Sequence, residues 1–237
     1  MSEITFESDG YTLAGNLFIN EQKSSDNAYL FIQGWAGSQN IEAAQALTNL
    51  GSTTMTYDMR GNKDSEGDLA EFSRSDFIKD AGAAYDYLRQ KVGERAYISV
   101  VGSSFGSYTA AILSTERDVY SLSLRVPANY PDEGYDEPQL AQITPETIEW
   151  RKQVLDFTQT KSLRALHDFN GKIQIIEAEA DEAIPSQTSK NYGHAVSNRS
   201  LLSYEVMPNA PHRLLTPELR EDYIARLIAW IQTNTYE

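Results

Sequence analysis

The sequence predicts an α/β fold in which a mostly parallel central sheet carries helices on both faces. Strand-like and helix-like segments alternate four times before residue 127, and the alternation resumes after residue 171. Residues 28–32 form a short, continuous apolar run, which is typical of a strand buried on both faces. A chain of 237 residues suits one such domain, which we expect to span residues 1–237.

The N-terminal half is expected to begin with an antiparallel hairpin, because two strand-like runs flank the turn signal Ser8-Asp9-Gly10. Asp76 is the candidate N-cap of a later helix, whose apolar residues recur at helical spacing. The strands expected here cover residues 4–6, 11–19, 28–32 and 53–57, and the helices cover 41–50 and 76–91.

The stretch from Pro127 to Gly171 interrupts the alternation. It opens with an irregular acidic segment and continues as two helix-like pieces near 145–157 and 161–169. Since it is too long and irregular for an ordinary connection, we expect a small helical cap insertion over one end of the sheet. Around it, strands are expected at 95–99, 120–126, 172–176 and 201–206, and helices at 108–113, from 186, and at 217–231.

The segment from Gly102 to Gly106 lies between a strand-like run and a helix-like one, and it has the pattern Gly-x-Ser-x-Gly. This strand–turn–helix sequence lifts the hydroxyl of Ser104 clear of a parallel sheet. Side chains at either glycine position would collide with neighbouring backbone in so tight a turn. The helix that follows directs its N-terminal amides and its dipole at a developing negative charge. Ser104 is therefore the candidate nucleophile.

A serine hydroxyl needs a base, usually a histidine that a carboxylate orients. His212 lies in the loop after the last strand, on the sheet edge that also carries Ser104, because parallel strands place all such loops on one side. The other two histidines, His167 and His194, are expected to be ordinary polar surface residues. His212 is therefore the candidate base.

The carboxylate is expected from the acidic loop after the strand at 172–176. The spacing from that strand and the Pro185 that follows favour Asp181. Three neighbouring acids compete for the role, namely Glu177, Glu179 and Glu182. Asp58 also ends a strand, and we expect it to hold the turn at Arg60-Gly61 together.

Two backbone amides are expected to form an oxyanion hole, since a tetrahedral intermediate carries a negative oxygen. One belongs to Phe105, the residue after the nucleophile. The other belongs to Trp35, because Gly34 allows that amide to turn inward. The indole of Trp35 is equally suited to packing, since only its backbone would act.

Together these motifs resemble the α/β-hydrolase superfamily over nearly the whole chain. Members typically carry His-Gly-x in the oxyanion loop, where this chain has Gln33-Gly34-Trp35. Their Asp-x-Arg-Gly loop is similar to Asp58–Gly61, and their Asp-x-x-x-Pro acid loop to Asp181–Pro185. The order Ser104, Asp181, His212 is the superfamily's own order. The segment Leu124–Ala128 and the helical insertion look most like compact bacterial esterases and serine-aminopeptidase-like hydrolases.

The resemblance and the residues predict a serine hydrolase, of carboxylesterase type, that cleaves small carboxylic esters through an acyl-enzyme. An aminopeptidase or amidase that uses the same three residues is one alternative. In it, four acids of the cap would receive a substrate amino group: Asp132, Glu133, Asp136 and Glu137. A catalytically silent hydrolase fold used for binding is the other alternative.

The partner that the resemblance implies is a small-molecule acyl substrate, and the composition disfavours two other classes of partner. The net charge of −14 disfavours nucleic acid and anionic membrane surfaces, which would be repelled. The chain has no cysteine, and the expected chemistry needs neither a metal nor an organic cofactor. Residues 1–6 lack the basic and apolar regions of a secretory signal, and no apolar segment reaches the length of a membrane span. We therefore expect a cytoplasmic protein.

Overall fold

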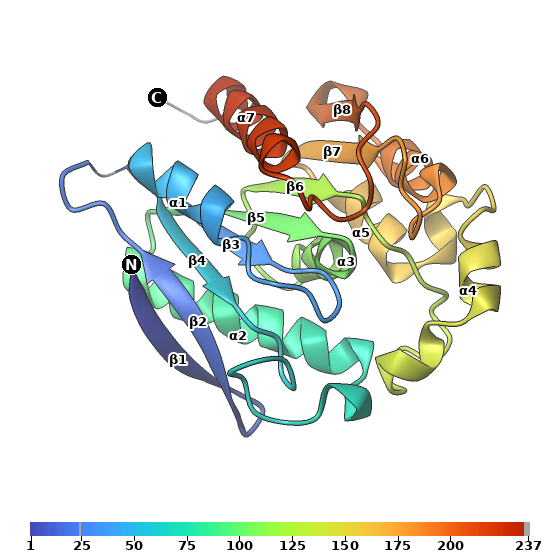
Figure 1. The fold of residues 1–237 in the computed structure, drawn as a ribbon, viewed down its shortest axis with the longest axis horizontal. Helices are drawn as coiled ribbons and strands as arrows, with labels where there is room; N and C mark the ends of the chain where they lie inside the picture. Colours follow the sequence, from blue (N-terminus) through green and yellow to red (C-terminus); the bar gives the residue numbers. More distant parts are fainter. Residues whose placement is uncertain (24, 235–237) are drawn as a thin grey trace.

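The apolar runs of the chain form one mixed sheet in the computed structural model, which describes residues 1–23 and 25–234 (Figure 1). The strand order within these residues is β1-β2-β4-β3-β5-β6-β7-β8. The strands are β1 (Ser2–Ser8), β2 (Tyr11–Phe18), β3 (Asn27–Ile32), β4 (Thr53–Tyr57), β5 (Tyr97–Ser103), β6 (Ser121–Arg125), β7 (Lys172–Ala178) and β8 (Leu202–Met207). β1 and β2 pair antiparallel, β2 also pairs antiparallel with β4, and the remaining neighbours are parallel. The predicted fold class and the N-terminal hairpin are confirmed.

Helices cover both faces of the sheet, as two separate apolar clusters show. The helices α1 and α7 bury Leu47 and Leu227 against one face, and α2, α3 and α6 pack on the other. In Figure 1 the sheet separates these two groups of helices. The main helices are α1 (Ile41–Asn49), α2 (Arg74–Val92), α3 (Phe105–Leu113), α4 (Pro145–Trp150), α5 (Lys161–Asp168), α6 (Ser186–Ala195) and α7 (Pro217–Asn234). None of the helices in the part of the chain that the structure describes has the length and apolar character of a membrane span.

The start of α2 differs from the prediction. Ser73, not Asp76, is the N-cap, and Asp76 occupies the third helical position of a capping box. The Ser73 hydroxyl accepts a hydrogen bond from the Asp76 amide at 3.3 Å, and the Asp76 carboxylate accepts one from the Ser73 amide at 3.0 Å. Because the two side chains satisfy each other's backbone, both residue types favour a helix start and only the geometry tells them apart. The predicted apolar face of the helix is buried.

The stretch from 127 to 171 contains less helix than predicted. The first piece, α4, ends at Trp150 and not near residue 157, and short 3-10 turns stand at Gln139–Gln142 and Phe157–Gln159. At the end of α4 the chain turns so that the Arg151 guanidinium donates to the Asn129 carbonyl at 2.9 Å. This contact spans 22 residues, so local helical periodicity does not encode it. The second piece, α5, packs against α3 and α6 in the helical layer.

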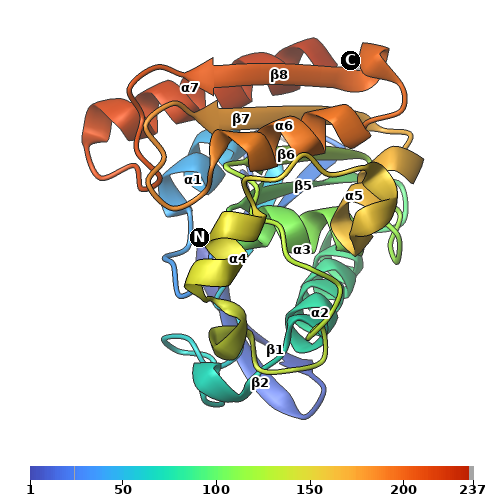
Figure 2. The same cartoon turned by 90° about the vertical axis from the view of Figure 1, so that its right-hand side faces the viewer.

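The segment that carries α4 lies beyond the carboxyl ends of the central strands. In Figure 1 the arrowheads of β5 and β6 point toward α4, and Figure 2 shows α4 in front of those strand ends. Arg74 of α2 ties down the start of this segment by donating to the carbonyls of Pro131 and Glu133, each at 2.6 Å. The same end of the sheet carries the candidate functional residues.

Candidate active site

Ser104 stands in a strained turn between β5 and α3. Its backbone angles, φ 56° and ψ −116°, lie outside the regions that helices and strands occupy. A methyl group at Gly102 would lie 2.5 Å from the Gly106 carbonyl oxygen, and one at Gly106 would lie 2.1 Å from that of Ile32. The glycines of the Gly-x-Ser-x-Gly pattern are therefore required by close backbone packing, which holds the half-buried Ser104 at the end of the sheet.

The structure brings together the three residues that the sequence predicts for catalysis. The Nε2 atom of His212 lies 3.1 Å from the Ser104 hydroxyl oxygen, across 108 residues of sequence. The Nδ1 atom of His212 lies 2.8 Å from Oδ2 of Asp181. His212 lies in the loop between β8 and α7, and Asp181 lies in the loop between β7 and α6. The geometry is that of a nucleophile, a base and an orienting carboxylate in one hydrogen-bonded chain.

Asp181 is fixed by its second oxygen. Its Oδ1 atom accepts hydrogen bonds from the amides of Ala183 at 2.8 Å and Ile184 at 2.7 Å. The carboxylate side chain is only 4% exposed, whereas the His212 side chain is 16% exposed. The loop thus leaves one oxygen of Asp181 free to hold the imidazole and keeps the other occupied.

The three competing acids of the same loop serve other partners. Glu177 accepts from the hydroxyl of Tyr204, and Glu179 accepts from the Asn209 amide at 2.8 Å. The Glu182 carboxylate accepts from the backbone amide of His212 at 3.1 Å, so it supports the base loop and not the imidazole. Among these four acids, Asp181 is the one whose carboxylate contacts the His212 ring.

The other two histidines lie away from Ser104. His194 is exposed on α6, as predicted for a surface residue. His167 differs, because it is half-buried and its ring stacks on that of Phe157 with centroids 3.7 Å apart. Its Nδ1 atom contacts the Ala195 carbonyl at 3.2 Å, so His167 is a packing residue.

The loop after β3 brings Trp35 beside the serine turn. A methyl group at Gly34 would lie 3.3 Å from Cβ of Ser104, so the loop passes close to the hydroxyl. The indole of Trp35 packs edge-on against the rings of Phe105 and Phe77, with centroids 5.6 Å and 5.3 Å away. Within the described residues, no loop carbonyl or side chain accepts from the Trp35 or Phe105 amide. Both amides are therefore available as donors.

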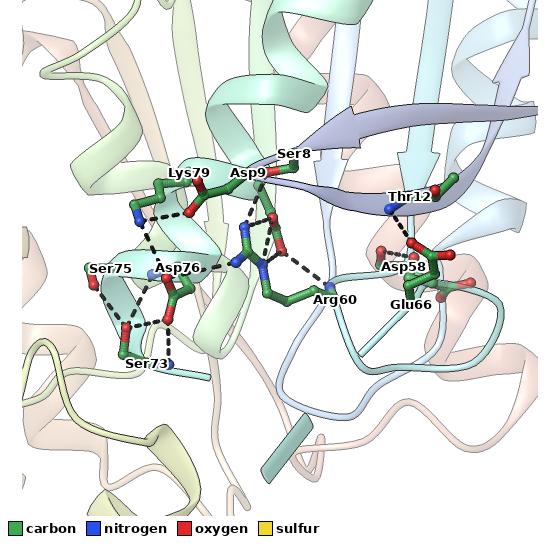
Figure 3. Close-up of polar contacts among 12 residues, drawn as sticks. Ser8, Asp9, Thr12, Asp58, Arg60, Glu66, Ser73, Ser75, Asp76 and Lys79 are labelled. Carbon is green, nitrogen blue, oxygen red and sulfur yellow. Dashed lines mark hydrogen bonds and ion pairs between the residues drawn. The ribbon is translucent and has the colours of Figure 1, made fainter. Parts of the chain in front are cut away.

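The loop after β4 holds a second polar network, which differs from the prediction for Asp58 (Figure 3). The Asp58 carboxylate accepts from the Gln39 side chain at 2.8 Å and does not reach the Arg60 turn. Instead, Asp80 of α2 accepts from the Arg60 amide at 3.1 Å and from its guanidinium at 2.6 Å. The Asp58 backbone carbonyl contributes by accepting from the Ser65 hydroxyl at 2.6 Å.

One residue at the site was missed by the sequence analysis, although a signal for it exists. Arg125 is the last residue of β6, and its guanidinium donates to the backbone carbonyl of His212 at 2.9 Å. A single cation at the end of an otherwise apolar or small-residue strand is unusual, because a buried charge needs a specific partner.

No group of three His, Asp or Glu side chains within the described residues forms a metal-binding cluster.

The fold and the site together define an α/β hydrolase. The structure of Est1E from Butyrivibrio proteoclasticus, solved with ferulic acid bound, superposes with a TM-score of 0.75 at 16% identity and covers 98% of each chain. The α/β hydrolase GrgF from Penicillium sp. sh18 gives a TM-score of 0.73 at 15% identity, again with 98% of each chain covered. At these identities the likeness is one of fold.

The sequence places the chain within a family of this class. The profile described as the prolyl oligopeptidase family matches residues 38–236, and the chain belongs to that family. A curated relative, the lysophosphatidylserine lipase ABHD12 of Danio rerio, is 27% identical over 204 residues. The match covers 78% of this chain and 51% of the relative, so the chain spans about half the length of that protein.

Proposed function

We propose that the chain is a serine hydrolase that cleaves small carboxylic esters through an acyl-enzyme. The observation that carries the proposal is the hydrogen-bonded chain from Ser104 through His212 to Asp181, at 3.1 Å and 2.8 Å. Support for an ester substrate comes from the relative named a lipase, since lipases act on esters. Within the segment 127–171, the part that carries α4 is proposed as the cap that bounds the substrate.

The proposed reaction uses each group in turn. Ser104 attacks the ester carbonyl while His212 takes the hydroxyl proton, and the amides of Trp35 and Phe105 bind the oxyanion. The C–O bond then breaks as His212 gives the proton to the leaving alcohol. Water repeats the sequence on the acyl-enzyme and releases the acid and free Ser104. Asp181 keeps the imidazole oriented and stabilises its charged form throughout.

An experiment on Ser104 tests this proposal. Wild type and Ser104→Ala are compared on p-nitrophenyl esters from acetate to long chains, and both are treated with an active-site fluorophosphonate. We expect the alanine variant to lose hydrolysis and labelling, because no other nucleophile faces His212 Nε2 in the described residues. Ser114→Ala is the matched control, since the Ser114 hydroxyl only caps α3 by donating to the Ala111 carbonyl at 2.7 Å. A wild-type enzyme that stays unlabelled while folded would favour a binding role for the fold.

Amide cleavage by the same three residues is the second candidate, because the family description names an oligopeptidase. One of the four acids that the sequence offered as an amine receptor is engaged elsewhere, which weakens the aminopeptidase interpretation. The Asp132 carboxylate accepts from the Lys161 amide at 2.7 Å and pairs with Arg164, so it is already engaged. Parallel assays with an aminoacyl p-nitroanilide and a neutral p-nitrophenyl ester distinguish the two substrate classes.

A further inference from the structure

Arg125 is a buried cation at the centre of the candidate site. The residue is 9% exposed, and it ends β6 between the strands that lead to Ser104 and to Asp181. Among the described residues, both hydrogen bonds of its guanidinium go to neutral oxygens. A buried charge without a carboxylate partner is costly, so a structural reason for its retention is needed.

The guanidinium bridges the two loops that carry the nucleophile and the base. Its Nη1 atom donates to the backbone carbonyl of His212 at 2.9 Å, and its Nη2 atom donates to the hydroxyl of Ser103 at 2.7 Å. Ser103 is the residue before the nucleophile. One rigid, planar side chain therefore spans from the His212 loop to the Ser104 turn, across 87 and 22 residues of sequence respectively.

The backbone of Arg125 holds the same turn from the other side. Its carbonyl accepts from the Ser104 amide at 2.9 Å and from the Ser107 hydroxyl at 3.0 Å. The next residue, Val126, is buried with φ 42°, a conformation that β-branched residues rarely adopt. Such strain persists only where the surroundings over-determine it, and it clusters at functional sites. The end of β6 is therefore tightly constrained against the Ser104 turn.

Two groups near the guanidinium of Arg125 partly oppose the effect of burial on its charge. The Tyr223 ring of α7 lies 5.7 Å from its central carbon. Burial lowers the pKa of Arg125. Electrostatic interactions with Tyr223 and with the negative charge of Asp181 oppose that shift. Since an arginine pKa lies far above neutrality, the side chain remains a donor at every working pH.

We propose that Arg125 is a positioning residue, which fixes the His212 loop relative to the Ser104 turn so that Nε2 reaches the hydroxyl. The proposal deepens the proposed function and rests on it for its kinetic consequences. Arg125 contacts neither the reacting atoms nor the imidazole in the described structure. Its effect on the reaction is therefore expected in kcat, through misplacement of His212, and not in substrate affinity.

The test replaces Arg125 with methionine and with lysine. Arg125→Met is expected to lower kcat about 10²-fold with little change in KM, because a displacement of about 1 Å at a catalytic group has that effect. Arg125→Lys is expected to recover little of the loss, since one ammonium cannot reach both oxygens as a planar fork does. A lysine variant with wild-type kcat would overturn the proposal, because charge alone would then be enough.

A spectroscopic readout makes the test independent of any substrate. The chain has three histidines, so the downfield Nδ1 proton of the His212–Asp181 hydrogen bond can be assigned by NMR with His212→Gln. In Arg125→Met this signal is expected to vanish or move upfield, even if the wild type hydrolyses no ester. An unchanged signal would overturn the proposal while leaving the proposed function untouched.

The matched control is Arg60→Lys, at a second buried arginine. Arg60 is fully buried and its guanidinium donates to Asp80, with no contact to Ser104, Asp181 or His212 in the described residues. Arg60→Lys is expected to lower stability while it keeps kcat and the His212 signal. If it reduces kcat as much as Arg125→Lys does, the effect at Arg125 is general loosening and the proposal fails.

Discussion

Two buried arginines organise two polar networks at different places in this fold, and they do so in opposite ways. Arg60 lies beneath the N-terminal hairpin, where its guanidinium meets Asp80 at 2.6 Å and Asp76 at 3.7 Å (Figure 3). Arg125 lies at the carboxyl end of the sheet, where its guanidinium meets only a backbone carbonyl and a hydroxyl. Near Arg125, the carboxylate of Asp181 is committed to His212.

The pKa values of the two guanidinium groups reflect this difference. Burial disfavours the charged form at both positions. At Arg60 the hydrogen bond and the charge of Asp80 outweigh burial and raise the pKa, whereas at Arg125 burial dominates and lowers it. The Arg60 network is closed upon itself and stabilises the fold. The Arg125 network leaves the hydroxyl of Ser104, whose backbone is strained, and the imidazole of His212 partly exposed, as a reaction with a substrate requires.

The largest expected effect comes from removing the candidate base, His212, which the Arg125 network holds. His212→Gln is expected to lower kcat on an ester about 10⁴-fold or more, because the hydroxyl of Ser104 then has no proton acceptor. Steady-state kinetics on p-nitrophenyl acetate measures the change. His194→Gln, on the exposed side of α6, is the control and is expected to keep full activity. Equal activity of the two variants would show that His212 is not the base.

A substitution in the Arg60 network is expected to change the stability of the fold and not kcat. Arg60→Met leaves Asp80 buried and unpaired, so the free energy of unfolding is expected to fall by about 3–5 kcal/mol. Urea denaturation measures this loss. Arg117→Met is the control, because the Arg117–Asp86 pair is 32% and 50% exposed and its loss should cost less than about 1 kcal/mol. A lower kcat in the folded Arg60→Met variant would contradict the assignment of the Arg60 network to stability alone.

Asp58 sharpens the comparison, because it is a buried carboxylate with no cation bonded to it in the described residues. Its Oδ1 atom has no hydrogen-bond partner, and both polar atoms of the buried Gln33 side chain lack one too. Burial raises the pKa of Asp58 above its value in the unfolded chain, although the Gln39 hydrogen bond opposes this. Asp58→Asn is expected to stabilise the fold at neutral pH by about 1 kcal/mol, since the charge is removed and a donor is added.

The sign of the pH dependence follows from the raised pKa of Asp58. A carboxyl that binds its proton more tightly when folded contributes stability below its unfolded pKa and loses that contribution as pH rises through the folded pKa. The advantage of Asp58→Asn should therefore shrink as pH falls toward 3.8, the ordinary pKa of an aspartate side chain. Thermal unfolding of both proteins across this range measures it. A gain that persisted unchanged at low pH would mean that packing, not charge, explains it.

Much of the fold followed from local patterns. The continuous apolar run at 28–32 lies within β3, because a strand buried on both faces favours unbroken apolar residues. The strand expected at 53–57 coincides with β4. The start of α2 and the end of α4 were predicted wrongly. At Ser73 and Asp76 two capping residues are chemically alike, and at Arg151 a contact with distant Asn129 ends the helical pattern.

The sequence by itself determined which residues were available for the site. The glycines around Ser104 admit one kind of turn, and the alternation of strands and helices puts Ser104, Asp181 and His212 at the same end of a parallel sheet. Only the tertiary structure decided that Asp181 and not Glu182 faces the imidazole, and that Arg125 spans the two loops. The physical reason is that hydrogen bonds depend on distances of a few tenths of an ångström, which topology limits but only packing fixes.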